Sequence, residues 1–101
     1  MRYNKLVRDK VPELILKKEG KVPITHVAGI KEYHEKLRAK LEEEIEEFLK
    51  TESIETLVDV QEVLDAIITF KQFNRTKIRS VREEKKKERG LFTRRIILDE
   101  A

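Results

Sequence analysis

Apolar residues recur every three or four positions through the middle of this chain, and this spacing constrains its fold more than any other feature. Between Ile30 and Lys50 they mark one stripe of an amphipathic helix. Between Ser53 and Phe73 they mark a second helix, whose wider stripe indicates burial on two sides. We therefore expect two long antiparallel helices that pack against each other.

Two other segments carry signals for helix ends. The segment Val11–Gly20 has Pro12 in the place of a first turn and closes on a glycine, which predicts a short helix. The segment Lys77–Arg89 is highly charged and is followed by Gly90, which predicts a C-terminal helix that stops there.

β-branched residues are frequent in segments 22–27 and 91–98, which suit short strands that could pair with each other. The predicted fold is an all-α helical bundle with two long antiparallel helices, a C-terminal charged helix and at most a short β element. A chain of 101 residues is expected to form one domain, residues 1–101. At this size a domain buries only roughly two-thirds of its unfolded surface, so we expect an oligomer.

The charge balance limits the classes of partner. With 23 basic and 20 acidic residues the net charge is +3, which does not require a polyanion-wrapping role. Acids concentrate between Glu42 and Asp65, whereas bases dominate from Lys71 to Arg95. This distribution suits a protein that holds a metal ion at one end and phosphate at the other.

The absence of cysteine excludes a disulfide framework, a thiol nucleophile and a thiolate metal site. The sequence has no apolar run typical of a signal peptide or a membrane span, so we expect a cytoplasmic protein with no membrane partner. Neither His26 nor His34 has a second His or Cys at ligand spacing. We expect structural or surface roles for both.

The first cluster of acids lies on the helix that begins near Ile30. At about 100° per residue, Glu43, Glu44 and Glu47 fall together on one flank of its apolar stripe. Like charges three or four residues apart on a helix repel each other by a few tenths of a kcal/mol, which is about the size of the attraction between opposite charges at the same spacing. A cation bound between the acids would turn this repulsion into a net attraction. The alternative is an ordinary solvated helix face, which is common in glutamate-rich chains.

The second cluster lies on the next helix. Asp59 falls among the apolar residues of the widened stripe, Glu62 lies at its border and Asp65 one step further out. A buried carboxylate must be paired or must coordinate a metal. Oxygen ligands from two neighbouring helices suit Mg²⁺, with Mn²⁺ as a substitute, and this ion is usually held by carboxylates together with substrate phosphates.

Three stretches of the chain are typical of a known family. They are the acid pattern Glu43-Glu44-Ile45-Glu46-Glu47 with Glu62-Val63-Leu64-Asp65, the opening Tyr3-Asn4-Lys5-Leu6-Val7-Arg8-Asp9-Lys10-Val11-Pro12-Glu13, and the closing Glu88-Arg89-Gly90-Leu91-Phe92-Thr93-Arg94-Arg95-Ile96. With them the chain resembles the MazG-like all-α nucleoside triphosphate pyrophosphohydrolases, in their phosphoribosyl-ATP pyrophosphohydrolase-like branch. The resemblance spans nearly the whole chain.

The resemblance implies a helical core, a homo-oligomer, magnesium, and hydrolysis between the α and β phosphates of a nucleotide to release pyrophosphate. It implies that the metal ligands are Glu43, Glu44, Glu47, Glu62 and Asp65, and that Glu44, Glu47 and Glu62 are the catalytic residues. Many relatives place the second motif one turn earlier, ending at the position of Asp59, whereas Thr56 stands here where its first acid would be. The second pair is therefore either Glu62 with Asp65 or Asp59 with Glu62.

Basic residues near both ends of the chain are candidates for binding the substrate phosphates. On the opening segment these are Lys5, Arg8 and Lys10. Arg8 and Asp9 could instead fix this segment against the bundle. The closing segment offers Arg89, Arg94 and Arg95, although a basic tail also suits simple solubility.

The predicted protein is a homodimeric or homotetrameric magnesium-dependent hydrolase that acts on a nucleotide. The first alternative is a nucleotide-binding or regulatory module without activity, which the missing acid at Thr56 favours. The second is a nucleic-acid-binding protein that uses Lys71, Lys77, Arg79, Arg82 and Lys85–Lys87, but six aromatic residues offer few stacking partners. The base and sugar of the substrate do not follow from a resemblance of fold.

Overall fold

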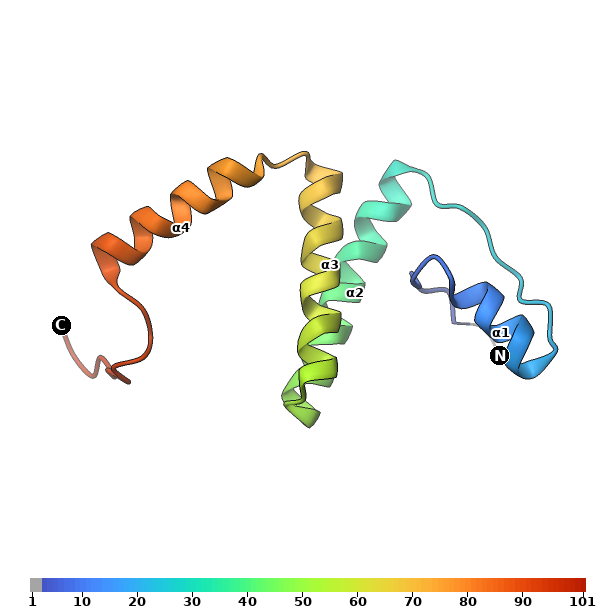
Figure 1. Ribbon diagram of the computed structural model, residues 1–101, viewed down its shortest axis with the longest axis horizontal. Helices are drawn as coiled ribbons and strands as arrows, with labels where there is room; N and C mark the ends of the chain where they lie inside the picture. Colours follow the sequence, from blue (N-terminus) through green and yellow to red (C-terminus); the bar gives the residue numbers. More distant parts are fainter. Residues whose placement is uncertain (1–2) are drawn as a thin grey trace. The chain divides into compact units, whose positions relative to one another are not determined.

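The computed structural model describes residues 3–101, which form four helices joined by irregular segments (Figure 1). They are α1 (Val11–Glu19), α2 (Ile30–Thr51), α3 (Ile54–Lys71) and α4 (Arg75–Arg89). The predicted all-α class is confirmed, and each helix begins and ends within two residues of the position expected. No helix within the described range combines the length and the apolar character that a membrane span requires.

The contacts within the chain group into two compact units, Met1–Ile67 and Ile68–Ala101. The first unit contains α1, α2 and most of α3. The second contains the end of α3, α4 and the closing segment.

The ends of α1 follow the sequence signals. Pro12 lies in the first turn, where the missing N–H costs no helical hydrogen bond. Gly20 has a φ of +67°, and its N–H donates to the carbonyl of Leu16 at 2.9 Å. A side chain at this left-handed position would be strained, so the glycine fixes the end of the helix.

Two residues, Glu52 and Ser53, connect α2 to α3 and fold the two helices into a hairpin (Figure 1). Glu52 takes a left-handed conformation, with a φ of +47°, and its N–H donates to the carbonyl of Phe48. Ser53 Oγ then accepts from the N–H of Thr56 at 3.2 Å, while Thr56 Oγ1 accepts from the N–H of Ser53 at 3.3 Å. This reciprocal pair satisfies two free donors at the start of α3.

The core of the first unit is small. Only Leu37 of α2 and Val63 of α3 are buried among the described residues, with 1% and 8% of their surface exposed. Several large apolar residues of the same hairpin stay exposed, namely Ile45, Leu49, Ile54, Leu57, Val58 and Leu64. Among the described residues, the wide stripe of α3 is thus covered on one side only.

In the second unit, Asn74 caps α4, because its side chain accepts from the N–H of Lys77 at 3.0 Å. The helix stops before Gly90, which has a φ of +81°. No residue of α4 is buried, and the apolar residues of the closing segment, among them Phe92, are exposed. This unit has local structure but almost no core.

The predicted β element is wrong for the described residues, since neither 22–27 nor 91–98 forms a strand. The two segments fall in different units. Pro23 removes a backbone donor from the first of them, and Val22 and Ile24 lie in solvent. High β-propensity does not make a strand without a neighbour to complete its hydrogen bonds.

Candidate functional site

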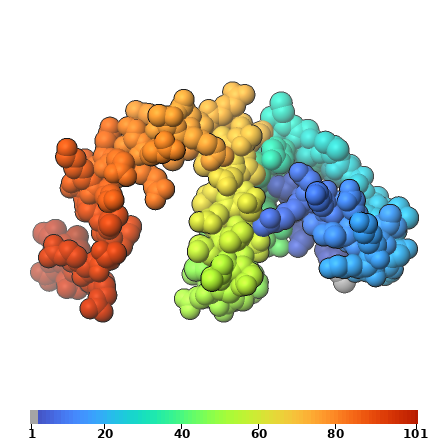
Figure 2. All heavy atoms as spheres, viewed as in Figure 1, coloured from blue at the N-terminus to red at the C-terminus, as the bar shows by residue number. Residues whose placement is uncertain are grey.

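The amino-terminal arm, residues 3–10, lies against the α2–α3 hairpin (Figure 2). Lys5 Nζ donates to Glu43 Oε1 of α2 at 2.9 Å. Arg8 Nη2 donates to Asp59 Oδ1 of α3 at 2.8 Å. Residues three apart span at most about 11 Å, so these contacts bring acids from the two helices to one surface.

Lys40 holds the neighbouring acids of α2 together. Its Nζ lies 3.4 Å from Glu43 Oε2 and 3.3 Å from Glu44 Oε1. The side chains of Lys40 and Glu44 are largely shielded, with 17% and 13% of their surface exposed. A lysine of the same helix thereby offsets the negative charge of both Glu43 and Glu44.

The pairing shifts the pKa of two of these groups. The hydrogen bond from Lys5 is the main cause that lowers the pKa of Glu43, and the charge of Lys40 acts in the same direction. The same hydrogen bond and the charge of Glu43 raise the pKa of Lys5. Both groups are therefore held in their charged forms around neutral pH.

The hairpin geometry adds Glu62 to this surface. Glu43 lies eight residues before the end of α2 and Glu62 eight residues after the start of α3, so both are about 12 Å from the connection. Glu62 also follows Asp59 by three residues, which places it on the same side of α3. Glu43, Asp59 and Glu62 thus share one side of the hairpin with the arm.

Two predicted acids remain, Glu47 and Asp65. Both are exposed, as is Glu62. Within residues 3–101 the carboxylates of Glu47 and Glu62 form no ion pair. In the same part of the chain no three acidic or imidazole groups converge closely enough to hold a metal ion.

The donor chemistry of the site suits Mg²⁺, because the acids supply oxygen ligands from two adjacent helices. Their arrangement does not enclose an ion, since Lys5, Lys40 and Arg8 occupy the carboxylates of Glu43, Glu44 and Asp59. A metal ion at this surface would have to compete with those cations.

Asp59 is paired, as its position in the apolar stripe predicts, but it is not buried. Its side chain is 40% exposed and Arg8 is its partner. This contact is the anchoring role that the sequence left open for Arg8. The arm is further fixed by Lys36, whose Nζ donates to the carbonyl of Asn4 at 2.7 Å.

Sequence reasoning did not single out Lys36 or Lys40. The spacing from Lys40 to Glu43 and Glu44, three and four residues, was visible in the sequence and could have indicated the ion pairs. Nothing in the sequence indicated that Lys36 would bind a backbone carbonyl 32 residues away.

Thr56 stands where the family pattern has an acid, and the structure gives it a structural role. Its hydroxyl lies 2.8 Å from Thr51 Oγ1 and 2.9 Å from Ser53 Oγ. It therefore closes the turn between α2 and α3. An acidic side chain in place of Thr56 would also accept a hydrogen bond from the N–H of Ser53 and so would cap α3. The presence of Thr56 instead of an acid therefore does not by itself mean that the arm surface has lost a metal ligand.

The other predicted phosphate contacts lie apart from these acids in the sequence. Lys10 is exposed at the end of the arm. Arg89 and Arg95 belong to the second unit and are exposed, and Arg95 has a φ of +57°. Their contact with phosphate stays a prediction. His26 lies on the surface with its Nε2 2.9 Å from Glu32 Oε1, which fits the surface role expected for it.

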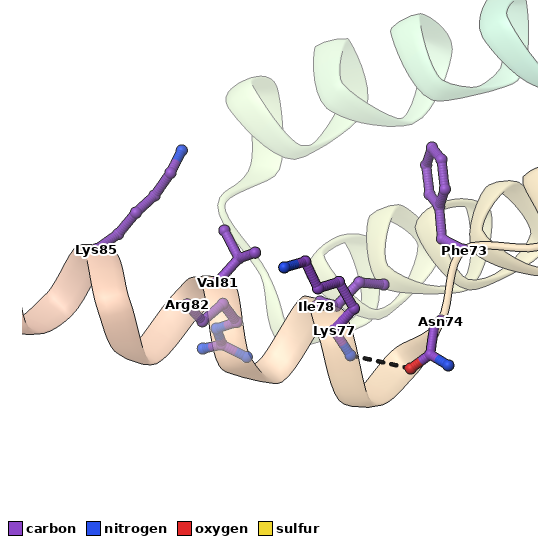
Figure 3. Close-up of a pocket in the computed structure, with 7 residues that line it drawn as sticks. All are labelled: Phe73, Asn74, Lys77, Ile78, Val81, Arg82 and Lys85. Atoms are coloured by element: carbon purple, nitrogen blue, oxygen red, sulfur yellow. Dashed lines mark hydrogen bonds between the residues drawn. The ribbon is translucent and has the colours of Figure 1, made fainter.

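A second feature is an open groove of about 370 Å³ on the second unit (Figure 3). Phe73, Ile78 and Val81 provide its apolar surface. The charged residues that line it are all basic, and they are Lys77, Arg82 and Lys85. In Figure 3, Phe73, Val81 and Lys85 extend to the same side of the segment.

Comparisons of the chain with protein-family models, with curated proteins and with solved structures found no match. The assignment of a function therefore depends on the residues of the site itself.

Proposed function

We propose that this chain is a magnesium-dependent pyrophosphohydrolase that cleaves a nucleoside triphosphate, or a related nucleotide, between its α and β phosphates. The products are a nucleoside monophosphate and pyrophosphate. The observation that supports this most directly is the surface where the arm meets the hairpin. There Glu43 and Asp59, from two helices, lie beside two residues of the type that binds phosphate, Lys5 and Arg8.

The acids of this surface would hold the ion. They are Glu43, Glu44 and Glu47 on α2, with Asp59, Glu62 and Asp65 on α3. Mg²⁺, or Mn²⁺ in its place, would supply positive charge to the phosphate oxygens. We assign the catalytic role to Glu44, Glu47 and Glu62. Among the described residues the carboxylates of Glu47 and Glu62 are not bound by a protein cation, and such a carboxylate can orient and deprotonate a water molecule. Glu44 would first have to be released from Lys40.

The arm would have two functions in turn. In the structure, Lys5 and Arg8 neutralise Glu43 and Asp59. With an ion bound at these acids, Lys5 and Arg8 would be released and could bind the substrate phosphates. Arg8 suits this exchange because its guanidinium can bind a phosphate through two parallel hydrogen bonds. Lys10, Arg89 and Arg95 are further candidates for phosphate binding.

Self-association is part of the proposal. Only Leu37 and Val63 are buried among the described residues, whereas twenty large apolar residues are exposed. So much apolar surface on a small chain is typical of a protein that buries it against a partner. We propose a homodimer or a homotetramer, with the uncovered stripe of the hairpin as the principal contact.

Incubation with a panel of nucleotides and Mg²⁺, with separate detection of pyrophosphate and orthophosphate, tests the activity. We expect pyrophosphate from at least one nucleotide and no turnover without a divalent ion. Glu47→Gln and Glu62→Gln should abolish turnover and leave the helical circular dichroism nearly unchanged. Glu55→Gln, at an exposed position of α3 outside the acid motifs, is the matched control and should stay active. Release of orthophosphate alone, or no turnover with any nucleotide, would contradict the proposal.

The second candidate is a nucleotide-binding module without activity. It is favoured by the occupation of Glu43 and Asp59 by cations and by the absence, within residues 3–101, of three converging acids. Equilibrium binding of a nucleotide that is recovered intact after prolonged incubation with Mg²⁺ would support this candidate over the enzyme.

A further inference from the structure

The strongest contrast in the molecule is one of charge. Residues 41–65, the acidic hairpin segment, contain ten acids and one base, a net charge of −9. Residues 71–95, the basic segment, contain eleven bases and three acids, a net charge of +8. Charge of one sign that is crowded on one segment repels itself, and the repulsion is relieved when the two segments meet.

The basic segment has a face on α4 that can receive another helix. Ile78, Val81, Arg82 and Lys85 lie at positions i, i+3, i+4 and i+7 and therefore on one side of α4. They line the open groove in Figure 3, and no residue of α4 is buried. An apolar floor with a basic rim fits a helix whose apolar stripe is flanked by acids.

The acidic hairpin segment carries such a helix face on α2. Glu42, Ile45, Glu46 and Leu49 have the same spacing and share one side of the helix. All four are exposed. They differ from Glu43 and Glu44, which contact Lys40 and lie on another side of α2.

The two faces match residue by residue when the helices run antiparallel. Leu49 then lies opposite Ile78, and Ile45 opposite Val81. Glu46 falls beside Arg82, and Glu42 beside Lys85. Each apolar residue meets an apolar residue and each acid meets a base. The parallel arrangement would place Glu42 beside Ile78 and Leu49 beside Lys85.

We propose that α4 of one copy docks antiparallel on the Glu42/Ile45/Glu46/Leu49 face of α2 in a second copy, and that the second copy returns the contact. The occupant is a second copy because the two faces that complement each other in charge and in apolar residues both belong to this sequence, and both are without a buried residue among those described. Two reciprocal contacts of this kind form an isologous, closed dimer.

The inference rests on the self-association in the proposed function but not on its chemistry. It assigns Glu42 and Glu46, which are exposed in one copy, to an interface between two copies. The two proposals can therefore fail independently. The dimer could form through this contact in a protein without hydrolase activity, and an active hydrolase could lack this contact.

Isotope-mixed cross-linking tests the contact directly. Protein with natural nitrogen and protein labelled with ¹⁵N are co-refolded at equal concentration and treated with a carbodiimide, which joins a lysine amine to a carboxylate without a spacer. We expect peptides that join Lys85 to Glu42 or Glu46, about half of them with one labelled and one unlabelled partner, as random pairing requires. The proposal would be overturned if the peptides that join Lys85 to Glu42 or Glu46 always carried the same isotope in both partners. It would also be overturned if a sample that is dimeric gave no such cross-linked peptides.

Charge reversal gives an independent measurement. Glu42→Lys and Lys85→Glu should each raise the dimer Kd about fivefold or more, because an exposed pair is lost and a like-charge pair replaces it. The double variant should recover at least half of that loss on a logarithmic scale. Lys87→Glu, the same charge change on the opposite side of α4, is the control. Equal effects of Lys85→Glu and Lys87→Glu, no recovery in the double variant, or a monomer at every concentration in sedimentation would overturn the inference.

Discussion

The α2–α3 hairpin and helix α4 are both amphipathic, yet the buried residues among those described all lie in the hairpin. The hairpin buries Leu37 and Val63, closes its turn with Ser53 and Thr56, and binds the amino-terminal arm. Helix α4 has a good N-cap but buries nothing. The difference shows that an apolar stripe indicates which face of a helix can be buried. Whether that face is buried depends on a neighbouring element that packs against it.

The largest expected effect is on the core of the hairpin. Leu37→Ala should lower the free energy of unfolding by about 2–5 kcal/mol, because it leaves a cavity at the best-shielded position of the described chain. Chemical denaturation followed by circular dichroism at 222 nm measures the change at a fixed protein concentration.

The matched change in the other region is Phe92→Ser, at a residue that is 99% exposed. It should alter the same free energy by less than about 0.5 kcal/mol. If Leu37→Ala were as mild as Phe92→Ser, the hairpin would not be the folding core of the molecule, and the contrast between the two regions would not hold.

The next effect concerns two N-caps that use the same chemistry in different regions. Ser53→Ala removes the cap of α3 and should cost about 0.5–2 kcal/mol of global stability. Asn74→Ala removes the cap of α4, where unfolding of the helix exposes no core, so we expect local fraying with little change in the denaturation midpoint.

Amide hydrogen exchange separates the two outcomes. Ser53→Ala should speed exchange throughout the hairpin, and Asn74→Ala only in the first turns of α4. A loss of protection in the hairpin after Asn74→Ala would show that the two regions unfold together.

Most of the fold could be predicted from the sequence because it is encoded locally. The period of apolar residues predicts α2 and α3, and Pro12, Gly20 and Gly90 mark the helix ends in the way the structure confirms. The β element was wrong because propensity is a preference of single residues, whereas a strand needs a partner that neither segment has among the described residues.

The candidate site was predicted less completely than the fold. The wheel positions indicated that Asp59 needs a partner, and the structure supplies Arg8 from 51 residues away. A helical wheel cannot show which cation reaches an acid from a distant segment, because that depends on how the arm folds. For the same reason the sequence left the role of Arg8 open between phosphate binding and anchoring of the arm, and it did not indicate that Lys5 would contact Glu43.

A smaller effect is expected where the arm meets the hairpin. If a metal ion competes with the arm, Lys5→Gln should tighten the binding of Mn²⁺ by about two- to fivefold, since an exposed ion pair contributes about 0.2–1 kcal/mol. Electron paramagnetic resonance of free Mn²⁺ measures this binding without any substrate. Lys10→Gln is the control, at an exposed position of the same arm. Weaker binding in Lys5→Gln than in the control would show that Lys5 helps to build the ion site.

The smallest effect is the titration of Glu43. Its pKa lies below the usual value of 4.5, chiefly because of the hydrogen bond from Lys5, so the pair adds stability above that value and loses it as the pH falls through the lowered pKa. The pKa of Lys5 is raised above 10.5, so the same contact is also lost as the pH rises through that raised value. Carbon NMR of the Glu43 carboxyl should give a higher pKa in Lys5→Gln than in the unmodified protein. In this variant Lys40 still contacts Glu43 and lowers its pKa, in opposition to burial, which raises it. An identical pKa in the two proteins would mean that Lys5 of the arm does not hold Glu43 in solution, and the arm would then be joined to the hairpin through Arg8 and Lys36 alone among the contacts described.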